Sequence, residues 1–204
     1  MNPRSDVSLT QLSDHLLRTL AAVPASSTIL ELGCSNGRHT LPLFQLGFDA
    51  YACDVEEEAV LRARAWVAEQ AGPAEAERRI TPILRIDALG YPDDFFDWVI
   101  AYDTFDSITS YDELSGALVE ARRVLKPGGW IYVAVPALDP AFNPRTQEAE
   151  YASDSGPQFS YTEDTLTQMM EENGLALAEV PRRTSTDHLR LEGIYRRVEP
   201  DTPV

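Results

Sequence analysis

Short runs of apolar residues recur along the chain between stretches of turn residues, and they predict the strands of a buried sheet. The runs fall, in chain order, at residues 28–32, 49–55, 81–86, 95–103 and 130–135. Strands of a parallel sheet, which is covered on both faces, show such near-continuous apolar runs rather than strict alternation. We therefore expect these segments to lie side by side in the core.

Between these strands, apolar residues at helical spacing predict amphipathic helices. One face of a leading helix carries Leu9, Leu12, Leu16 and Leu20, and Ser8 with Gln11 fits its capping box. Further helices are predicted at residues 38–46, 56–70, 111–125 and 162–173. Alternation of this kind implies right-handed crossovers. The predicted fold class is α/β, a doubly wound, mainly parallel, Rossmann-like sheet in a single domain.

The C-terminal third departs from this alternation. The segment "KPGG" at 126–129 is predicted to end a helix and to turn the chain into the strand at 130–135. Residues 136–160 carry four prolines and little periodicity, which is typical of a long loop, and such loops often cover active sites. Two closing strands follow at 175–180 and 190–198, and they give the sheet an antiparallel C-terminal strand.

Composition narrows the range of partners. The 204 residues carry a formal net charge of −16, so the phosphates of nucleic acids and anionic membranes are repelled. No segment approaches the roughly 20 apolar residues of a membrane span. We expect a soluble, cytoplasmic protein without a nucleic-acid or membrane partner, and a homodimer is left open. Cys34 and Cys53 show no metal-ligand spacing, so we expect buried, reduced thiols and no metal site.

The segment "GCSNG" at 33–37 matches the G-x-S-x-G pattern of hydrolases, in which Ser35 would be the nucleophile. That motif needs an earlier strand to supply part of its oxyanion hole, whereas here only a helix precedes the first strand. A nicotinamide dinucleotide site is the nearer alternative, because Asp54 follows Gly33 by about 20 residues. The middle and third glycines of G-x-G-x-x-G are absent, however, which disfavours a pyrophosphate ligand.

Taken together and in order, five motifs resemble those of the class I S-adenosylmethionine-dependent methyltransferases. They are "ELGCSNG" after the first strand, "ACDV", "RIDAL", "FDWVIAYD" and "RRVLKPGGWIYVAVP". The resemblance covers residues 28–136. It implies a cofactor-binding core there, with an N-terminal helix or lid at 1–27 and an acceptor-side loop, helix and closing strands at 137–204.

The resemblance also implies roles for individual residues. Glu31 would accept a hydrogen bond from the methionine ammonium, unless it only orders the loop, and Gly33 and Gly37 would let the backbone approach the ligand. Asp54 would accept both ribose hydroxyls, cap the following helix, or do both, and Asp87 would accept from the adenine amino group unless it is only a turn residue. The predicted cofactor-binding set is Glu31, Gly33, Cys34, Gly37, Asp54, Val55, Asp87, Ala88, Ala101 and Tyr102.

The catalytic candidates are less well defined. Many small-molecule methyltransferases of this kind have a histidine pair after the fourth strand, but this chain has Asp106-Ser107 there. Asp106 is therefore the candidate to replace it, either as general base or as a residue that only holds the acceptor. The full candidate set is Asp106, His39, Tyr161 and His188. We expect His15 to be solvated on the polar side of the leading helix, and the C-terminal arginines to form a solvated edge or to meet an anionic acceptor.

The sequence thus predicts an enzyme that transfers a methyl group from S-adenosylmethionine to a small-molecule acceptor by in-line displacement. Alignment of the reactants and exclusion of water would provide most of the acceleration. Two alternatives stay open: a non-catalytic partner or sensor that binds the same cofactor, and, less favoured, a nicotinamide-dependent oxidoreductase.

Overall fold

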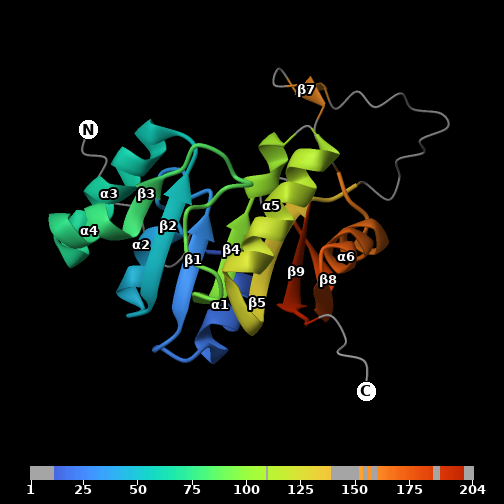
Figure 1. Cartoon of the computed structure of the whole chain (residues 1–204), viewed down its shortest axis with the longest axis horizontal. Helices are drawn as coiled ribbons and strands as arrows, with labels where there is room; N and C mark the ends of the chain where they lie inside the picture. The colour runs from blue at the N-terminus through green and yellow to red at the C-terminus, as the bar shows by residue number, and fades with distance from the viewer. Residues whose placement is uncertain are drawn as a thin grey trace.

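The structure, a computed structural model, describes most of the chain as one α/β unit (Figure 1). The described residues are 12–108, 110–138, 152–153, 156–157, 160–185 and 189–199. The strands are β1 (Thr28–Leu32), β2 (Asp49–Asp54), β3 (Ile80–Pro82), β4 (Phe96–Tyr102), β5 (Leu125–Pro136), β6 (Ala152–Ser153), β7 (Gly156–Pro157), β8 (Leu175–Ser185) and β9 (Leu189–Arg197). The helices are α1 (Asp14–Ala22), α2 (Thr40–Gln45), α3 (Glu57–Ala71), α4 (Pro73–Arg79), the 3-10 helix η2 (Thr104–Ser107), α5 (Tyr111–Val124) and α6 (Glu163–Glu172).

Seven strands form one mixed sheet in the order β3-β2-β1-β4-β5-β9-β8. The pairs from β3 to β5 are parallel, whereas β9 runs antiparallel to both β5 and β8. The doubly wound, mainly parallel fold predicted from the sequence is thereby confirmed. The order reverses between β1 and β4, and the carboxyl ends of strands at such a reversal form a crevice in which ligands bind.

Helices cover both faces of the sheet (Figure 1). On one face, α5 and α6 bury Leu114, Leu118 and Leu166 against β4, β5 and β9. On the other, α1 and α2 place Leu16 and Leu43 in a core with strand residues of β1, β4 and β5. A third cluster joins α3 and α4 to β2 and β3. The site-bearing ends of the strands are therefore held by core packing on both sides.

Several predicted boundaries were wrong. The leading helix begins at Asp14, where the Ser13 hydroxyl accepts from the Leu16 amide at 3.0 Å, while the predicted cap at Ser8 and Gln11 lies outside the described residues. The strand predicted at 81–86 is only three residues long, since β3 lies at the sheet edge and, among the described residues, pairs with β2 alone. Helix α4 was missed, although Pro73 at its first position is a helix-start signal.

The "KPGG" segment does not separate helix from strand as predicted. Strand β5 starts at Leu125, directly after α5, and the segment forms a bulge within it. Phe96 of β4 pairs with Leu125 and Trp98 pairs with Trp130, so the intervening residues of β5 loop out, with Gly128 at a φ of 72°. Strand β8 is also irregular, because its register with β9 shifts on either side of Glu179.

Part of the predicted acceptor-side loop lies outside the described residues. Where the structure describes it, Ala152–Ser153 and Gly156–Pro157 pair as a small antiparallel sheet. The following helix α6 is capped by Thr162, whose hydroxyl accepts from the Thr165 amide at 3.1 Å. No described helix combines the length and the apolar character that crossing a membrane requires.

Candidate functional site

A cavity of about 700 Å³ opens at the carboxyl ends of β1, β2 and β4. Its walls come from the loop after β1, the end of β2, the segment after β3, and the end of β4 with η2. The position matches the crevice expected at the reversal of strand order. Carboxylates outnumber guanidinium groups in the lining, with Glu31, Asp54, Glu56, Asp103 and Glu113 against Arg38 and Arg85.

The loop after β1 is a tight turn held to β2 by backbone hydrogen bonds. The amides of Gly33 and Cys34 both donate to the Cys53 carbonyl, at 2.9 and 3.0 Å. Gly33, Ser35 and Gly37 all have positive φ, of 78°, 47° and 82°. Ser35 contributes its amide, which donates to the Asp54 carboxylate at 2.8 Å. The loop therefore presents backbone to the cavity, and Ser35 serves as a turn residue rather than as a nucleophile.

The two glycines are required by packing as well as by φ. A Cβ on Gly33 would lie 2.9 Å from the Thr104 side chain, and a Cβ on Gly37 would lie 3.0 Å from the Ala63 Cα in α3. Gly33 lines the cavity, whereas Gly37 does not. Close approach of the loop to α3 is therefore a packing reason for Gly37, and its predicted role in the approach of a ligand stays a prediction.

Glu31, at the base of the cavity, is a buried carboxylate with 1% of its surface exposed. The Thr40 hydroxyl donates to its Oε2. The Nδ1 atom of His39 lies 3.4 Å from its Oε1. Burying a carboxylate is unfavourable without such partners. Glu31 therefore both orders the start of α2 and leaves acceptor capacity at the cavity surface.

His39 lies beside Glu31 and also lines the cavity. Its ring packs against the Tyr102 ring, with 4.6 Å between the centroids. The Nε2 atom is buried and makes no hydrogen bond within the described part of the chain. A buried polar atom without a partner is unusual, and here it belongs to a residue of the cavity wall.

Asp54 and two apolar residues form another wall of the cavity. The Asp54 carboxylate accepts from the amides of Ser35 and Glu56 at 2.8 and 3.0 Å, one on each oxygen. Each carboxylate oxygen can accept a further bond. Val55 and Leu84 are 55% and 98% exposed. Large apolar side chains left so open beside hydrogen-bond acceptors suit a flat ligand that has an apolar face and hydroxyl groups.

A cluster of charges closes the wall after β4. Asp103, at a φ of 57°, accepts two bonds from the Arg190 guanidinium at 2.5 and 2.9 Å. The Arg38 guanidinium lies 3.2 Å from the same carboxylate and 5.3 Å from the Tyr102 ring. Arg190 thus bridges the closing strands to the cavity wall, so the expectation of a solvated arginine edge does not apply to it.

Both cysteines are buried thiols, as the sequence predicts. Burial and the neighbouring carboxylates raise the pKa of Cys34 and Cys53 well above the usual range. A thiol with a raised pKa is a poor nucleophile and a poor metal ligand. Cys34 therefore lines the cavity as a neutral side chain.

The structure brings most of the predicted cofactor set together. Among the predicted residues, the cavity is lined by Glu31, Gly33, Cys34, Asp54, Val55 and Tyr102. Gly37, Asp87, Ala88 and Ala101 lie outside its lining. Asp87 is held by the Arg85 guanidinium, with a 2.7 Å bond to Oδ1, which lowers the pKa of Asp87.

Of the four catalytic candidates, His39 lines the cavity, while Asp106 and Tyr161 lie outside its lining. His188 lies outside the described residues. Burial, together with the negative charge of Asp103, raises the pKa of Asp106 to about 7, and its Oδ1 makes no hydrogen bond within the described residues. Burial, together with the Asp106 charge, raises the pKa of the Tyr161 hydroxyl above its usual range.

Sequence reasoning missed Arg38, Leu84 and Thr104 at the cavity. Arg38 directly follows the glycine loop, so its position was a usable signal. Leu84 looked like a strand residue, and only the shortness of β3 exposes it. Thr104 acts through tertiary contacts, since its hydroxyl donates to the Leu32 carbonyl and its methyl group packs over Gly33.

Comparison with known proteins agrees with this geometry. A family model described as "Methyltransferase domain" matches residues 5–180. The protein named Probable methyltransferase ltbC, from Aspergillus luteorubrus, is 31% identical over 142 residues, covering 64% of this chain and 47% of that protein. The ubiquinone biosynthesis O-methyltransferase of Roseobacter denitrificans is 31% identical over 132 residues, covering 63% and 50%. The chain thus spans about half the length of the curated relatives it matches.

Solved structures share the fold at low identity. A SAM-dependent methyltransferase from Methanosarcina mazei superposes with a TM-score of 0.72 at 18% identity, covering 92% of this chain and 98% of that one. The 1,6-didemethyltoxoflavin-N1-methyltransferase of Burkholderia thailandensis, solved with S-adenosylhomocysteine, gives 0.71 at 17% identity, covering 91% and 76%. The chain therefore belongs to the methyltransferase domain family, and its sheet is that of a class I, Rossmann-like S-adenosylmethionine-dependent methyltransferase.

Proposed function

We propose that this protein transfers a methyl group from S-adenosylmethionine to a small-molecule acceptor. The observation that carries the proposal is the cavity itself, which combines a buried carboxylate, a glycine turn, a second carboxylate and open apolar side chains. These features match the ammonium, ribose and adenine of the cofactor. Bound there, S-adenosylmethionine supplies a methyl group activated by its sulfonium.

The Asp54 wall suits the nucleoside. Its carboxylate oxygens each hold one backbone amide and have room to accept one ribose hydroxyl more. Val55 and Leu84, both largely exposed, would cover the faces of the adenine ring and be shielded from water by it. In this assignment the adenine lies against apolar side chains. Asp87 lies outside the cavity lining and binds the guanidinium of Arg85, which is part of the lining.

The Glu31 end of the cavity suits the methionine portion. The buried Glu31 carboxylate would accept a hydrogen bond from the methionine ammonium of the cofactor. The Arg38 guanidinium at the rim would pair with the methionine carboxylate of the cofactor. His39 stands between Glu31 and Tyr102, with Nε2 unpaired in the described structure. We assign His39 to contact the reacting ligands and to accept the acceptor's proton, because Glu31 can orient its other nitrogen.

The proposal leaves the acceptor atom open within a small organic molecule. The names of the relatives include an O-methyltransferase and an N1-methyltransferase, so both oxygen and nitrogen acceptors occur on similar chains. Transfer to either atom proceeds by in-line displacement, in which alignment supplies much of the acceleration. We further propose that the chain acts in the cytoplasm without a nucleic-acid or membrane partner, because its formal net charge of −16 repels anionic surfaces.

Calorimetric titration with S-adenosylmethionine and S-adenosylhomocysteine tests the proposal directly. We expect saturable binding of both, and Asp54→Ala should weaken it about tenfold or more by removing charge-assisted bonds. Asp97→Ala is the matched control, since Asp97 also accepts from a backbone amide, Thr28 at 2.8 Å, but at the opposite end of the sheet. Absence of binding to the wild type would refute the proposal.

Titration with NADH separates the oxidoreductase alternative. The carboxylates of the lining disfavour a pyrophosphate, so we expect no saturable binding of NADH. A non-catalytic partner would bind S-adenosylmethionine as well, but would release no S-adenosylhomocysteine with any acceptor until a second subunit is added.

A further inference from the structure

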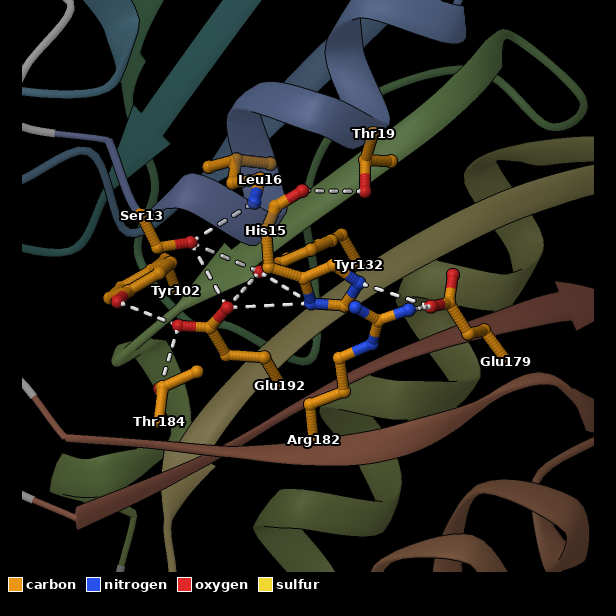
Figure 2. A network of polar contacts seen from close by, with 10 residues as sticks. All are labelled: Ser13, His15, Leu16, Thr19, Tyr102, Tyr132, Glu179, Arg182, Thr184 and Glu192. Carbon is orange, nitrogen blue, oxygen red and sulfur yellow. Dashed lines mark hydrogen bonds and ion pairs between the residues drawn. The ribbon is translucent and has the colours of Figure 1, made fainter.

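A buried carboxylate lies behind the cavity wall, where the sequence indicated only a strand residue. Glu192, on β9, is fully buried. Figure 2 shows four hydroxyl groups converging on it. Tyr102 and Thr184 donate to Oε1 at 3.2 and 3.0 Å, and Ser13 and Tyr132 donate to Oε2 at 3.0 and 2.6 Å. These donors come from β4, β8, β5 and the residue that caps α1, so one side chain connects five segments.

One arm of this network reaches the cavity. Tyr102 lines the cavity and packs its ring against His39, while its hydroxyl is bound by Glu192 on the far side. Burial and the Glu192 charge raise the pKa of Tyr102 to about 12, so the hydroxyl stays protonated and remains a donor. The bond to Glu192 therefore holds the Tyr102 ring in one orientation, and the His39 ring packs against it.

The other arm reaches the N-terminal helix. The Ser13 hydroxyl donates to Glu192 while accepting from the Leu16 amide, so the cap of α1 is tied to the same carboxylate. His15, expected to be solvated, is instead buried: its Nδ1 lies 3.4 Å from Glu192 and its Nε2 lies 3.5 Å from Glu179. No local sequence pattern indicates this contact, because Glu192 lies 177 positions further along the chain.

Protein stability alone does not explain why a charged residue is buried at position 192. An apolar side chain of similar volume in such a position is often as stabilising as a buried charge with its partners, because desolvation offsets the Coulombic gain. What the carboxylate supplies that an apolar residue cannot is directional bonding from several elements to one point. Within the network, Tyr102 is the member that lines the cavity.

We propose that Glu192 is a positioning residue of the cofactor cavity, which binds the Tyr102 hydroxyl behind the cavity wall, so holding the Tyr102 ring in that wall, and connects the wall to the N-terminal helix through Ser13. This inference rests on the proposed function for its ligand. It assigns no contact between Glu192 and the ligand; its effect on binding passes through Tyr102.

A double-mutant cycle in S-adenosylhomocysteine binding tests the connection. We expect Glu192→Gln and Tyr102→Phe each to weaken binding about threefold to tenfold, and the double variant to be no weaker than the poorer single variant, because both substitutions act on the same bond between Tyr102 and residue 192. Glu179→Gln is the matched control. It makes the same chemical change beside His15, but among the described residues Glu179 pairs with His15 and Arg182 and with no residue of the cavity lining. The affinity of this variant should stay within about twofold of wild type. Independent, multiplying effects of Glu192→Gln and Tyr102→Phe would overturn the proposal.

Hydrogen exchange on the free protein provides a second readout that needs no ligand. In Glu192→Gln, amides of α1 and of residues 102–108 should exchange faster than in wild type, while those of α3 should not change. Faster exchange spread evenly over all elements would mean only a loss of global stability, and unchanged exchange at 102–108 would equally refute the positioning role. Should the wild type fail to bind S-adenosylhomocysteine, the proposed function falls and this measurement still decides the role of Glu192.

Discussion

The neutral form of Asp106 makes protein stability depend on pH in a defined window. Burial and the Asp103 charge, partly offset by Arg190, raise the pKa of Asp106 from 3.8 to about 7 in the folded protein. A group with a raised folded pKa binds its proton more tightly in the native state. The contribution of Asp106 to the free energy of unfolding is therefore complete below about pH 4 and is lost as the pH rises to about 7. A shift of about three units corresponds to about 4 kcal/mol over the whole window.

The substitution Asp106→Asn isolates this effect, because an amide has nearly the shape of the protonated carboxyl and does not titrate. From pH 5 to pH 8 we expect the free energy of unfolding of the wild type to fall by about 2 to 3 kcal/mol relative to the variant. Urea unfolding at both pH values measures the difference. Asp112→Asn is the control, because Asp112 is an exposed carboxylate at the start of α5. Its change in unfolding free energy between the two pH values should differ from that of the wild type by less than about 1 kcal/mol.

Parallel stabilities of wild type and Asp106→Asn at the two pH values would show that the carboxyl is not held neutral, and the reasoning from burial would fail.

Two further predictions use matched pairs. Gly37→Ala should destabilise the protein by about 2 to 4 kcal/mol, since it combines a positive φ with a Cβ forced against α3, whereas Gly47→Ala, with similar φ and open space, should cost only about 1 kcal/mol in urea unfolding. Leu84→Ser should leave the melting temperature unchanged but weaken S-adenosylhomocysteine binding about threefold to tenfold, because its exposed side chain would be covered only by the ligand. Leu61→Ser, on an exposed leucine of α3 away from the cavity, should change neither quantity, and equal affinities for the two serine variants would contradict the adenine assignment.

The sequence was sufficient for those elements whose own residues determine them. Strand β1 was predicted with the bounds the structure has, because a central parallel strand is apolar along its length. The glycine turn and Asp54 were predicted as neighbours because they lie at the carboxyl ends of parallel strands, and in the structure both line the cavity. The length of β3 was overestimated, because an apolar run indicates burial whereas strand length depends on neighbouring strands. Within the described part of the chain, β3 pairs only with β2.

Residues defined by distant partners could not be found in this way. His15 occupies a polar position of its helix, and its burial follows from Glu192 and Tyr132, which are more than a hundred positions away. Glu192 sits in a strand pattern where a glutamate normally faces water. Arg190 was grouped with the other C-terminal arginines, as part of a solvated edge or as a contact for an anionic acceptor, whereas Asp103, in a left-handed turn after β4, pairs with it at the cavity wall. In each case tertiary contact overrides the local pattern.

The two edges of the sheet have a consequence for how copies of this chain can associate. Edge β3 offers only three residues and includes Pro82, which has no amide hydrogen to donate. Edge β8 is broken by register shifts on both sides of Glu179, and Pro181 lies in the same stretch. Short, interrupted or proline-bearing edges are poor templates for an incoming strand. Self-association through a continuous intermolecular sheet, including the route to fibrils, is thereby disfavoured at both ends of the molecule.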